Sequence, residues 1–129
     1  MNGRYTFKKE ERISAAKDID LLFKAGQSFK SFPLRVLYVT KPLCNGTPKP
    51  KILISVPKKQ FKHAVDRNRI KRLIREAYRL NKNNLTAAIA SKDFCLQIAF
   101  IYIKKEDCIY EEIENAIKKA LFIMEENLS

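Results

Sequence analysis

The apolar positions of this chain begin with a helical pattern. Ile19, Leu22 and Phe23 recur at the spacing that places side chains on one face of a helix. Ser14 stands where an N-cap residue is favoured, and Gly26 stands where a helix commonly stops. The first segment is therefore predicted to be an amphipathic helix whose apolar face consists of these three residues.

The pattern then changes from helical to extended spacing. In the run FPLRVLYVT, Leu34, Val36 and Tyr38 alternate with a second set of residues. That second set consists of Arg35, Leu37 and Val39. The alternation predicts a strand with one face more buried than the other. Another strand is predicted over Lys51–Pro57, where the proline ends it.

A continuous apolar run without alternation occupies Phe94–Ile103. Such a run is typical of a strand that is covered on both faces, so this strand is predicted to lie in the centre of the sheet. Two further helices are predicted, one over Ala64–Asn81 and one that follows Asp107 as its N-cap. The stripe predicted to be buried on the last helix consists of Ile109, Ile113, Ala116, Ile117, Ala120, Leu121 and Met124.

The length and composition fit a single globular domain. The chain has 129 residues, of which 46% are hydrophobic and 31% are charged, and it contains no repeat, low-complexity segment or linker. We expect one α+β domain over residues 1–129, with helices packed on a sheet, and leave the order of residues 1–12 open.

Cysteine spacing and hydropathy disfavour several classes of protein. Cys44, Cys95 and Cys108 form no C-x-x-C motif, so neither a disulfide framework nor a zinc site is predicted. No apolar run approaches the ~18 residues of a membrane span, and the first residues lack the apolar stretch of a signal peptide. The sequence therefore predicts a soluble cytoplasmic protein with reduced thiols.

The charge of the chain is strongly positive and is concentrated in one segment. Lys and Arg number 26 against 14 Asp and Glu, which gives a formal net charge of +12. Residues 58–82 contain ten basic and two acidic residues, which is +8 of that charge. This excess indicates a polyanionic partner or, less often, an acidic membrane surface.

The long basic helix separates into an apolar face and a cationic face. Its predicted buried side chains are Ile70, Leu73, Ile74, Ala77 and Leu80. The opposite face carries Asn68, Arg72, Arg75 and Arg79, with Arg67, Lys71 and Tyr78 on one flank and Arg69 and Glu76 on the other. A solvated helix face normally mixes charges, because like charges four residues apart are destabilising. Here a single acid accompanies six bases from Arg67 to Arg79.

Arginine in this arrangement favours phosphate as the partner. The planar guanidinium binds phosphate bidentately and is less strongly hydrated than an ammonium group. A DNA-binding helix-turn-helix is disfavoured because a strand that ends at Pro57 is predicted before the helix. A membrane surface is disfavoured because the apolar face of the helix is moderate and lacks Trp. RNA fits better, since a ridge of arginines can match the phosphates of an irregular groove.

The segment ISVPKKQFKHAVDRNRIKRLIREAYRL resembles the signature of the bacterial ribonuclease P protein component. The residues that carry the resemblance are Arg67, Asn68, Arg69, Lys71, Arg72 and Arg75. The resemblance extends back through SVPKK at residues 55–59 and through the first predicted helix, so it covers much of the chain.

This family implies both a fold and a function. The implied fold is a single-domain α-β sandwich of order α-βββ-α-β-α, similar to a ribosomal-protein domain, with a left-handed βαβ crossover. The implied function is that of the protein subunit of ribonuclease P, a ribonucleoprotein that removes the 5′ leader from precursor tRNA. The resemblance further implies that the RNA subunit binds most of the Mg²⁺ and performs the hydrolysis, that the protein alone is inactive, and that it has no membrane association or stable protein partner.

Carried over by position, the resemblance assigns two surfaces and no catalytic or metal-binding residue. The residues implied for binding the catalytic RNA are Arg67, Asn68, Arg69, Lys71, Arg72, Arg75 and Arg79. The residues implied for a cleft that binds the leader are Phe23, Tyr38, Ser55, Lys58, Lys59, Lys71 and Arg75. Aromatic rings beside cations suit a single strand, because stacking contributes ~1 to 3 kcal/mol per base without demanding a sequence.

The chain departs from the family pattern at two places. Ile19 stands where the family usually has a second Phe, which removes a stacking platform, and QFKH at residues 60–63 replaces a commoner Gly-Asn approach to the helix. His63 is interpreted as a phosphate contact or a surface residue and not as a metal ligand. The alternative function is a ribosomal or ribosome-assembly RNA-binding protein of similar fold. That alternative explains the arginine ridge but not a second cleft lined by aromatic and lysine side chains.

Overall fold

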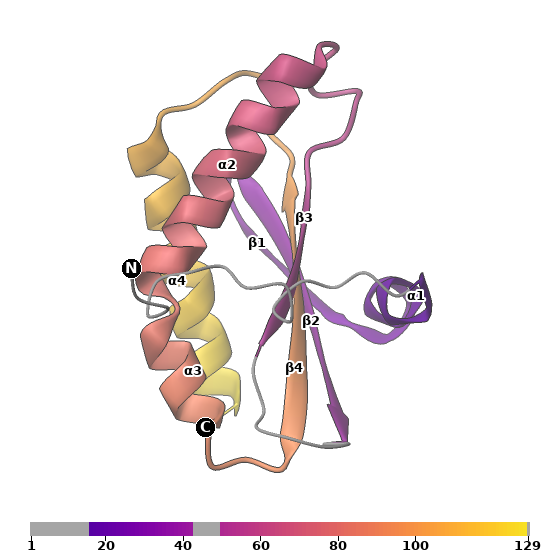
Figure 1. The fold of residues 1–129 in the computed structure, drawn as a ribbon, viewed down its shortest axis with the longest axis vertical. Helices are drawn as coiled ribbons and strands as arrows, with labels where there is room; N and C mark the ends of the chain where they lie inside the picture. Colours follow the sequence, from indigo (N-terminus) through magenta and orange to yellow (C-terminus); the bar gives the residue numbers. More distant parts are fainter. Residues whose placement is uncertain (1–15, 43–49, 129) are drawn as a thin grey trace, which may run out of the picture.

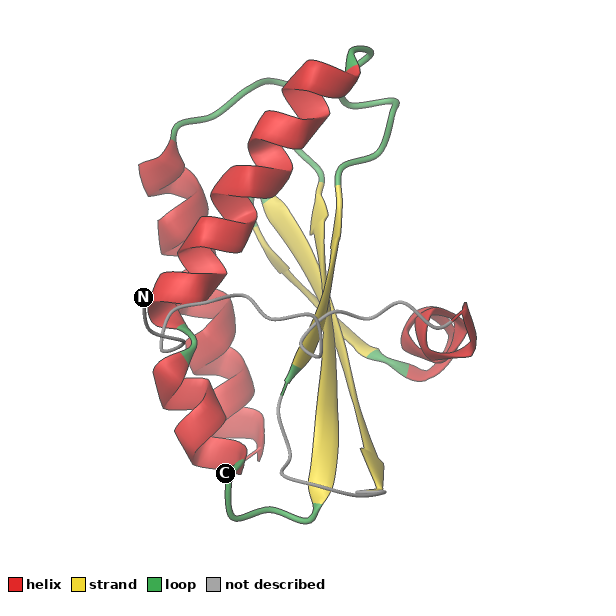
Figure 2. Ribbon diagram, viewed as in Figure 1, coloured by secondary structure: helices red, strands yellow, loops and turns green. Residues whose placement is uncertain are grey.

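The computed structural model describes residues 16–42 and 50–128 and shows a four-stranded sheet with helices on both faces (Figures 1 and 2). The helices are α1 (Ala16–Ala25), α2 (Ala64–Asn81), α3 (Asn83–Ile89) and α4 (Tyr110–Leu128). The strands are β1 (Gln27–Ser31), β2 (Leu34–Pro42), β3 (Lys51–Ser55) and β4 (Phe94–Tyr102). In Figure 1, α2, α3 and α4 form a layer on one face of the sheet and α1 lies on the other. The predicted α+β class is confirmed.

Three features of the sequence analysis fall outside the described residues. They are the predicted N-cap at Ser14, the thiol of Cys44 and the order of residues 1–12. Within the described residues, no helix combines the length and the apolarity needed to cross a membrane.

The strand order of the sheet is β1-β2-β4-β3. β2 pairs antiparallel with both β1 and β4, whereas β3 and β4 are parallel. β4 therefore lies inside the sheet, as its continuous apolar pattern predicted, with Leu96, Ile98 and Phe100 fully buried. The connection from β3 to β4 runs through α2 and α3. Viewed from the helical layer, β4 lies to the left of β3, so the crossover is left-handed, as the resemblance implied (Figure 1).

The main core fills the space between the sheet and the layer of α2, α3 and α4. Strand alternation directs Val36 and Tyr38 of β2 into this core, beside Phe100 of β4. Tyr78 of α2 packs on Phe100 with the ring centroids 6.0 Å apart. Phe29 of β1 packs edge-on against Tyr38 with the centroids 6.1 Å apart. Leu34, Val36 and Tyr38 of β2 are thus committed to this core.

α1 packs on the opposite face of the sheet through Leu22, which is fully buried against Leu37 and Ala99. Ile19 adds a partly buried contact. Phe23 follows Leu22 by a 100° step around the helix and is 53% exposed. Of the three residues of the predicted apolar face, Leu22 and Ile19 therefore contact the sheet, whereas the ring of Phe23 is left accessible.

Gly26 allows the chain to turn directly from α1 into β1. Its backbone N–H donates to the carbonyl oxygen of Leu22 at 3.0 Å, which closes the last turn of α1. A β carbon at this position would lie 2.4 Å from the same oxygen and 3.3 Å from the carbonyl oxygen of Tyr38. Only glycine fits this approach without a backbone shift.

The sequence pattern did not predict the residue ranges of two elements, β1 and α3. β1 is an edge strand whose exposed residues, Gln27, Ser28 and Lys30, are polar. α3 follows α2 after Lys82 and buries Leu85 and Ile89, so the order is α-βββ-α-α-β-α and the implied order lacked this short helix.

The buried arc of α2 is rotated from its predicted position. Tyr78, predicted on an exposed flank, is fully buried, whereas Leu80, predicted to be buried, is 42% exposed. The rotation places the largest apolar side chain of the helix on Phe100 in the sheet. Packing against a second layer, which the helical period alone does not reveal, decides which flank of the helix turns inward.

α4 begins later than predicted, at Tyr110. Ile109 is 66% exposed and does not belong to the buried stripe, whose other predicted members are all buried. Asp107 is not the N-cap of α4, because its carboxylate accepts the N–H of the next residue, Cys108, at 2.8 Å and pairs with Arg69 of α2.

Candidate nucleic-acid interface

The basic helix α2 is anchored to the loop that precedes it. The Arg67 guanidinium donates two hydrogen bonds to the carbonyl oxygens of Phe61 and Lys62, at 2.9 and 3.0 Å. The ring of Phe61 packs on Tyr102 of β4 with the centroids 5.7 Å apart. Both partners are backbone carbonyl groups, so no carboxylate offsets the charge of Arg67 in this contact. The N-terminal end of the cationic face is therefore fixed relative to the sheet.

Arg69 is paired with Asp107 from the loop before α4. The hydrogen bond between them raises the pKa of Arg69 and lowers the pKa of Asp107, so both groups remain charged. The two side chains are 37% and 58% exposed, so this pair contributes little to folding stability. It nevertheless places a carboxylate on an arginine that the resemblance assigned to RNA binding.

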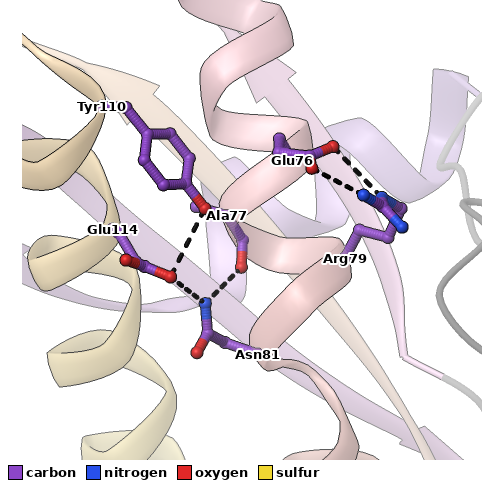
Figure 3. Close-up of polar contacts among 6 residues, drawn as sticks. All are labelled: Glu76, Ala77, Arg79, Asn81, Tyr110 and Glu114. Carbon is purple, nitrogen blue, oxygen red and sulfur yellow. Dashed lines mark hydrogen bonds and ion pairs between the residues drawn. The ribbon is translucent and has the colours of Figure 1, made fainter.

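Arg79 is paired with a carboxylate of its own helix (Figure 3). Its Nε and Nη2 atoms donate to the two carboxylate oxygens of Glu76 at 3.1 and 2.6 Å. This hydrogen bonding raises the pKa of Arg79. Two arginines of the predicted RNA surface thus face acids of the protein itself.

Four polar side chains of the predicted RNA surface are open to a ligand: Asn68, Lys71, Arg72 and Arg75. Asn68 and Arg72 are exposed, and Lys71 and Arg75 are half-buried. Within residues 16–42 and 50–128, no hydrogen bond or ion pair engages any of the four. Their donors are therefore available for phosphate.

A second surface lies on the α1 face of the sheet. Ser55 at the end of β3 has the same strand parity as Leu53, which packs towards α1, so the side chain of Ser55 lies on this face. Arg35 of β2 also lies here, and its Nη1 donates to the hydroxyl of Ser28 at 3.3 Å. The exposed ring of Phe23 flanks the face from α1.

Lys58 and Lys59 are exposed in the turn that follows β3. β3 is an outer strand of the sheet, so this turn lies at the edge between the α1 face and the face that carries α2. Of the predicted cleft residues, the structure thus places Phe23 and Ser55 on the α1 face, Lys58 and Lys59 at the edge beside it, and Lys71 and Arg75 on α2. Arg35 is an additional cation on the α1 face that the resemblance did not indicate.

Tyr38 does not belong to this surface. Its side chain points into the main core, on the opposite face of the sheet from Phe23, and it is 4% exposed. Its hydroxyl accepts a hydrogen bond from the Nδ2 atom of Asn127 at 2.9 Å. The predicted placement is corrected by strand parity, because the β2 residues that face α1 are Arg35, Leu37 and Val39, and Tyr38 alternates with them.

The contact between α2 and α4 includes a group of partly buried polar side chains (Figure 3). The Nδ2 atom of Asn81 donates to the carbonyl oxygen of Ala77 at 2.8 Å and to Oε2 of Glu114 at 3.2 Å. The hydroxyl of Tyr110 donates to the same carboxylate oxygen at 3.4 Å. The contact is therefore closed by the protein's own groups, and its carboxylate is turned towards α2.

The described part of the chain contains no group of three or more His, Cys, Asp or Glu residues that could hold a metal ion. His63 is the residue before α2, is exposed, and makes no capping hydrogen bond with its side chain. The chemistry that the geometry offers is thus the binding of phosphates by cations and of bases by an exposed aromatic ring.

Comparison with known proteins identifies the family. The family model for Ribonuclease P matches residues 7–125. The ribonuclease P protein component of Porphyromonas gingivalis is 38% identical over 113 residues, which span 88% of this chain and 82% of that protein. The same component of Chlorobaculum tepidum is 41% identical over 97 residues, spanning 70% of this chain and 63% of that protein.

Solved structures agree with this relationship. The RNase P protein of Staphylococcus aureus superimposes with a TM-score of 0.66 and 28% identity, covering 88% of this chain and 94% of that one. The RNase P protein of Thermotoga maritima gives a TM-score of 0.66 and 27% identity, covering 86% of this chain and 94% of that one. The family match over nearly the whole chain and the shared fold lead to one conclusion: this chain belongs to the ribonuclease P protein family.

Proposed function

We propose that this protein binds the RNA subunit of ribonuclease P through the cationic face of α2. The observation that carries the proposal is the group of open donors at Asn68, Lys71, Arg72 and Arg75, on a helix whose opposite face is buried in the main core. Guanidinium and ammonium groups at helical spacing match a phosphate backbone without reading its sequence. Partnership with ribonuclease P RNA follows from membership of the family.

We assign the 5′ leader of precursor tRNA to the α1 face of the sheet and its β3 edge. The proposed contacts are Phe23, Ser55, Lys58 and Lys59, with Lys71 and Arg75 reaching from α2. An exposed aromatic ring beside cations suits single-stranded RNA, because the ring can stack on a base while the cations contact the phosphates. Tyr38 is left out of this assignment because it is buried on the other face.

The protein's part in the reaction is to position RNA. In-line hydrolysis of a phosphodiester by metal-activated water needs no side-chain nucleophile. We propose that the RNA subunit holds the Mg²⁺ ions and performs the hydrolysis, and that the protein's cations neutralise phosphates that would otherwise need additional Mg²⁺. The protein without RNA is then inactive, and its stimulation of the RNA is greatest at low Mg²⁺.

The decisive experiment combines purified protein, the cognate RNA subunit and precursor tRNA at low Mg²⁺. Cleavage at the mature 5′ end is expected only when RNA and protein are both present, and raising the Mg²⁺ concentration should reduce the advantage that the protein gives. Cleavage by rigorously RNA-free protein would overturn the assignment of catalysis to the RNA. Tight binding to ribosomal RNA without stimulation of cleavage would indicate a ribosomal or ribosome-assembly protein instead.

A further inference from the structure

The two flanks of α2 differ in charge. On the flank towards α4, the helical period aligns Asp66, Arg69, Leu73 and Glu76. The cation of this flank, Arg69, is paired with Asp107, and Asp66 adds a second negative charge close enough to raise the pKa of Arg69 further. Two carboxylates, Asp107 and Asp66, thus act on the Arg69 guanidinium, while Glu76 on the same flank is paired with Arg79.

The acidic character continues from this flank into α4. Residues 106–126 hold seven Asp and Glu residues and two Lys residues. Glu114 faces α2 through Asn81, whereas the charge of Glu112 is offset by Lys104, which lies 3.1 Å away. A phosphate that approached α2 from this side would meet a negative surface.

The flank towards β3 has the opposite character. Arg67, Lys71 and Arg75 follow one another at i, i+4 and i+8 on this side, and the described residues place no carboxylate against them. Tyr78 lies between this flank and the sheet, where it packs on Phe100. α2 lies over the β3 side of the sheet and α4 over the β1 side (Figure 1). This flank of α2 therefore lies next to the sheet edge that β3 forms.

We propose that the RNA backbone contacts α2 from one side only, along the crest at Asn68 and Arg72 and the flank towards β3. The flank towards α4 is closed to phosphate, and Arg69 acts as a positioning residue that ties α2 to the loop before α4. This inference rests on the proposed function, because it gives the direction from which that same RNA meets the helix. It makes the RNA surface continuous with Lys58 and Lys59, around the edge of the sheet.

A matched pair of arginine substitutions tests the proposal. Arg69→Gln and Arg75→Gln each remove one charge from a partly exposed position on the same helix, but on opposite flanks. RNA-subunit affinity is measured for both variants over a range of salt concentrations, and thermal melts verify the fold. Arg75→Gln is expected to weaken binding and to lower the slope of log affinity against log salt by about 1. Arg69→Gln is expected to leave that slope unchanged.

A second variant approaches the same question without removing a cation. Asp107→Asn breaks the ion pair and frees the Arg69 guanidinium. On our proposal the salt slope stays unchanged, because no phosphate lies within reach of Arg69. If RNA does contact that flank, the freed guanidinium raises the affinity and steepens the slope.

The outcomes separate this inference from the function on which it rests. One-sided docking is supported if Arg75→Gln lowers the affinity for the RNA subunit, Arg69→Gln does not, and Asp107→Asn leaves the salt slope unchanged. Equal losses at Arg69 and Arg75, or a steeper slope for Asp107→Asn, overturn one-sided docking but leave the RNA-binding helix in place. If neither Arg75→Gln nor the same change on the crest, Arg72→Gln, weakened RNA binding, both the one-sided docking and the RNA-binding helix would be overturned.

Discussion

The side-chain amide of Asn127 donates a hydrogen bond to the hydroxyl of Tyr38 at 2.9 Å, joining the last turn of α4 to the second strand of the sheet. The hydroxyl of this tyrosine is thereby satisfied within the protein, and its ring packs on Phe29 at 6.1 Å. Tyr38 is therefore a structural residue that holds α4 against the sheet.

Substitution of Tyr38 is expected to reduce stability and not to act selectively on the leader. Tyr38→Phe keeps the ring and loses one hydrogen bond, which should lower the free energy of unfolding by about 0.5–1.5 kcal/mol. Tyr38→Ala empties part of the core and should cost about 3–5 kcal/mol. Urea denaturation measures both changes. A stable Tyr38→Ala variant that lost only its preference for precursor over mature tRNA would contradict this interpretation.

Phe23 should behave in the opposite way, because its ring is exposed on α1. Phe23→Ala is expected to leave the melting temperature nearly unchanged and to weaken holoenzyme binding of a precursor tRNA with a leader of several nucleotides by ~1–3 kcal/mol. Binding of mature tRNA should not change. Phe122→Ala is the matched control, since Phe122 is 60% exposed but lies on α4. Similar losses for both variants would show that Phe23 is not a specific contact.

Ile19 offers a gain-of-function test on the same helix. It lies one helical turn before Phe23 and is partly buried beside Leu22. Ile19→Phe adds a second ring at the position where the family usually has one, and it should tighten leader binding or leave it unchanged. The comparison is made with precursor and mature tRNA in parallel. A loss of leader binding by a fully folded variant would count against the α1 face as the leader surface.

Gly26→Ala should disturb the attachment of α1. The added methyl group would lie 2.4 Å from the carbonyl oxygen of Leu22, which as backbone cannot move aside easily. We expect a loss of stability of about 1–3 kcal/mol, typical of overpacking, measured by urea denaturation. Because Phe23 is carried on the same helix, leader binding should fall as well. An unchanged free energy of unfolding would show that α1 can shift without cost.

The buried thiol of Cys108 predicts a dependence of stability on pH. Burial raises the pKa of this thiol above its ordinary value of 9.0, and a hydrogen bond with Tyr102 acts in the opposite direction. An acid whose pKa is higher in the folded state binds more protons there than in the unfolded chain, so its stabilising contribution is complete below the unfolded pKa and is lost as the pH rises. The free energy of unfolding should therefore decrease above about pH 9.

Cys108→Ala isolates this contribution. The variant should be less stable than the parent protein near neutral pH, because a buried side chain is truncated, by about 1 kcal/mol. The difference between the two proteins should narrow above pH 9, since only the parent protein has this thiol to titrate. Burial also raises the pKa values of Tyr102 and Tyr110. The contribution of Tyr110 cancels in the comparison, whereas that of Tyr102 cancels only in part, because its phenol interacts with the Cys108 thiol. A difference that stayed constant to pH 10 would contradict the assignment.

The sequence was most informative where a pattern depends on local spacing. The continuous apolar run of β4 correctly predicted a central strand, and the period of α2 correctly separated Ile70 and Ile74 from Arg72. The placement of Tyr78 was wrong because a helix between a sheet and another helix buries more than one face, and the sequence of the helix alone does not reveal which flank turns inward.

Long-range contacts decided the remainder of the site. The partner of Arg69 is supplied by Asp107, which the pattern treated as a helix cap, and nothing local to either residue indicates their contact. For Tyr38, in contrast, local information was sufficient. The alternation that predicted β2 already grouped Tyr38 with Leu34 and Val36 on the face opposite Arg35. Strand parity could therefore have removed Tyr38 from the leader cleft.

The lengths of the strands bear on whether the sheets of two copies of this protein can join edge to edge. The inner strands β2 and β4 have nine residues each, whereas the outer strands β1 and β3 have five. An unpaired strand edge is a template for another chain, and short edges that carry lysine resist such pairing. Lys30 on β1 and Lys51 on β3 are both exposed. The positive charge that suits the protein to a polyanion thus also discourages its sheets from joining edge to edge. Replacing both lysines with uncharged residues should increase aggregation without changing the fold.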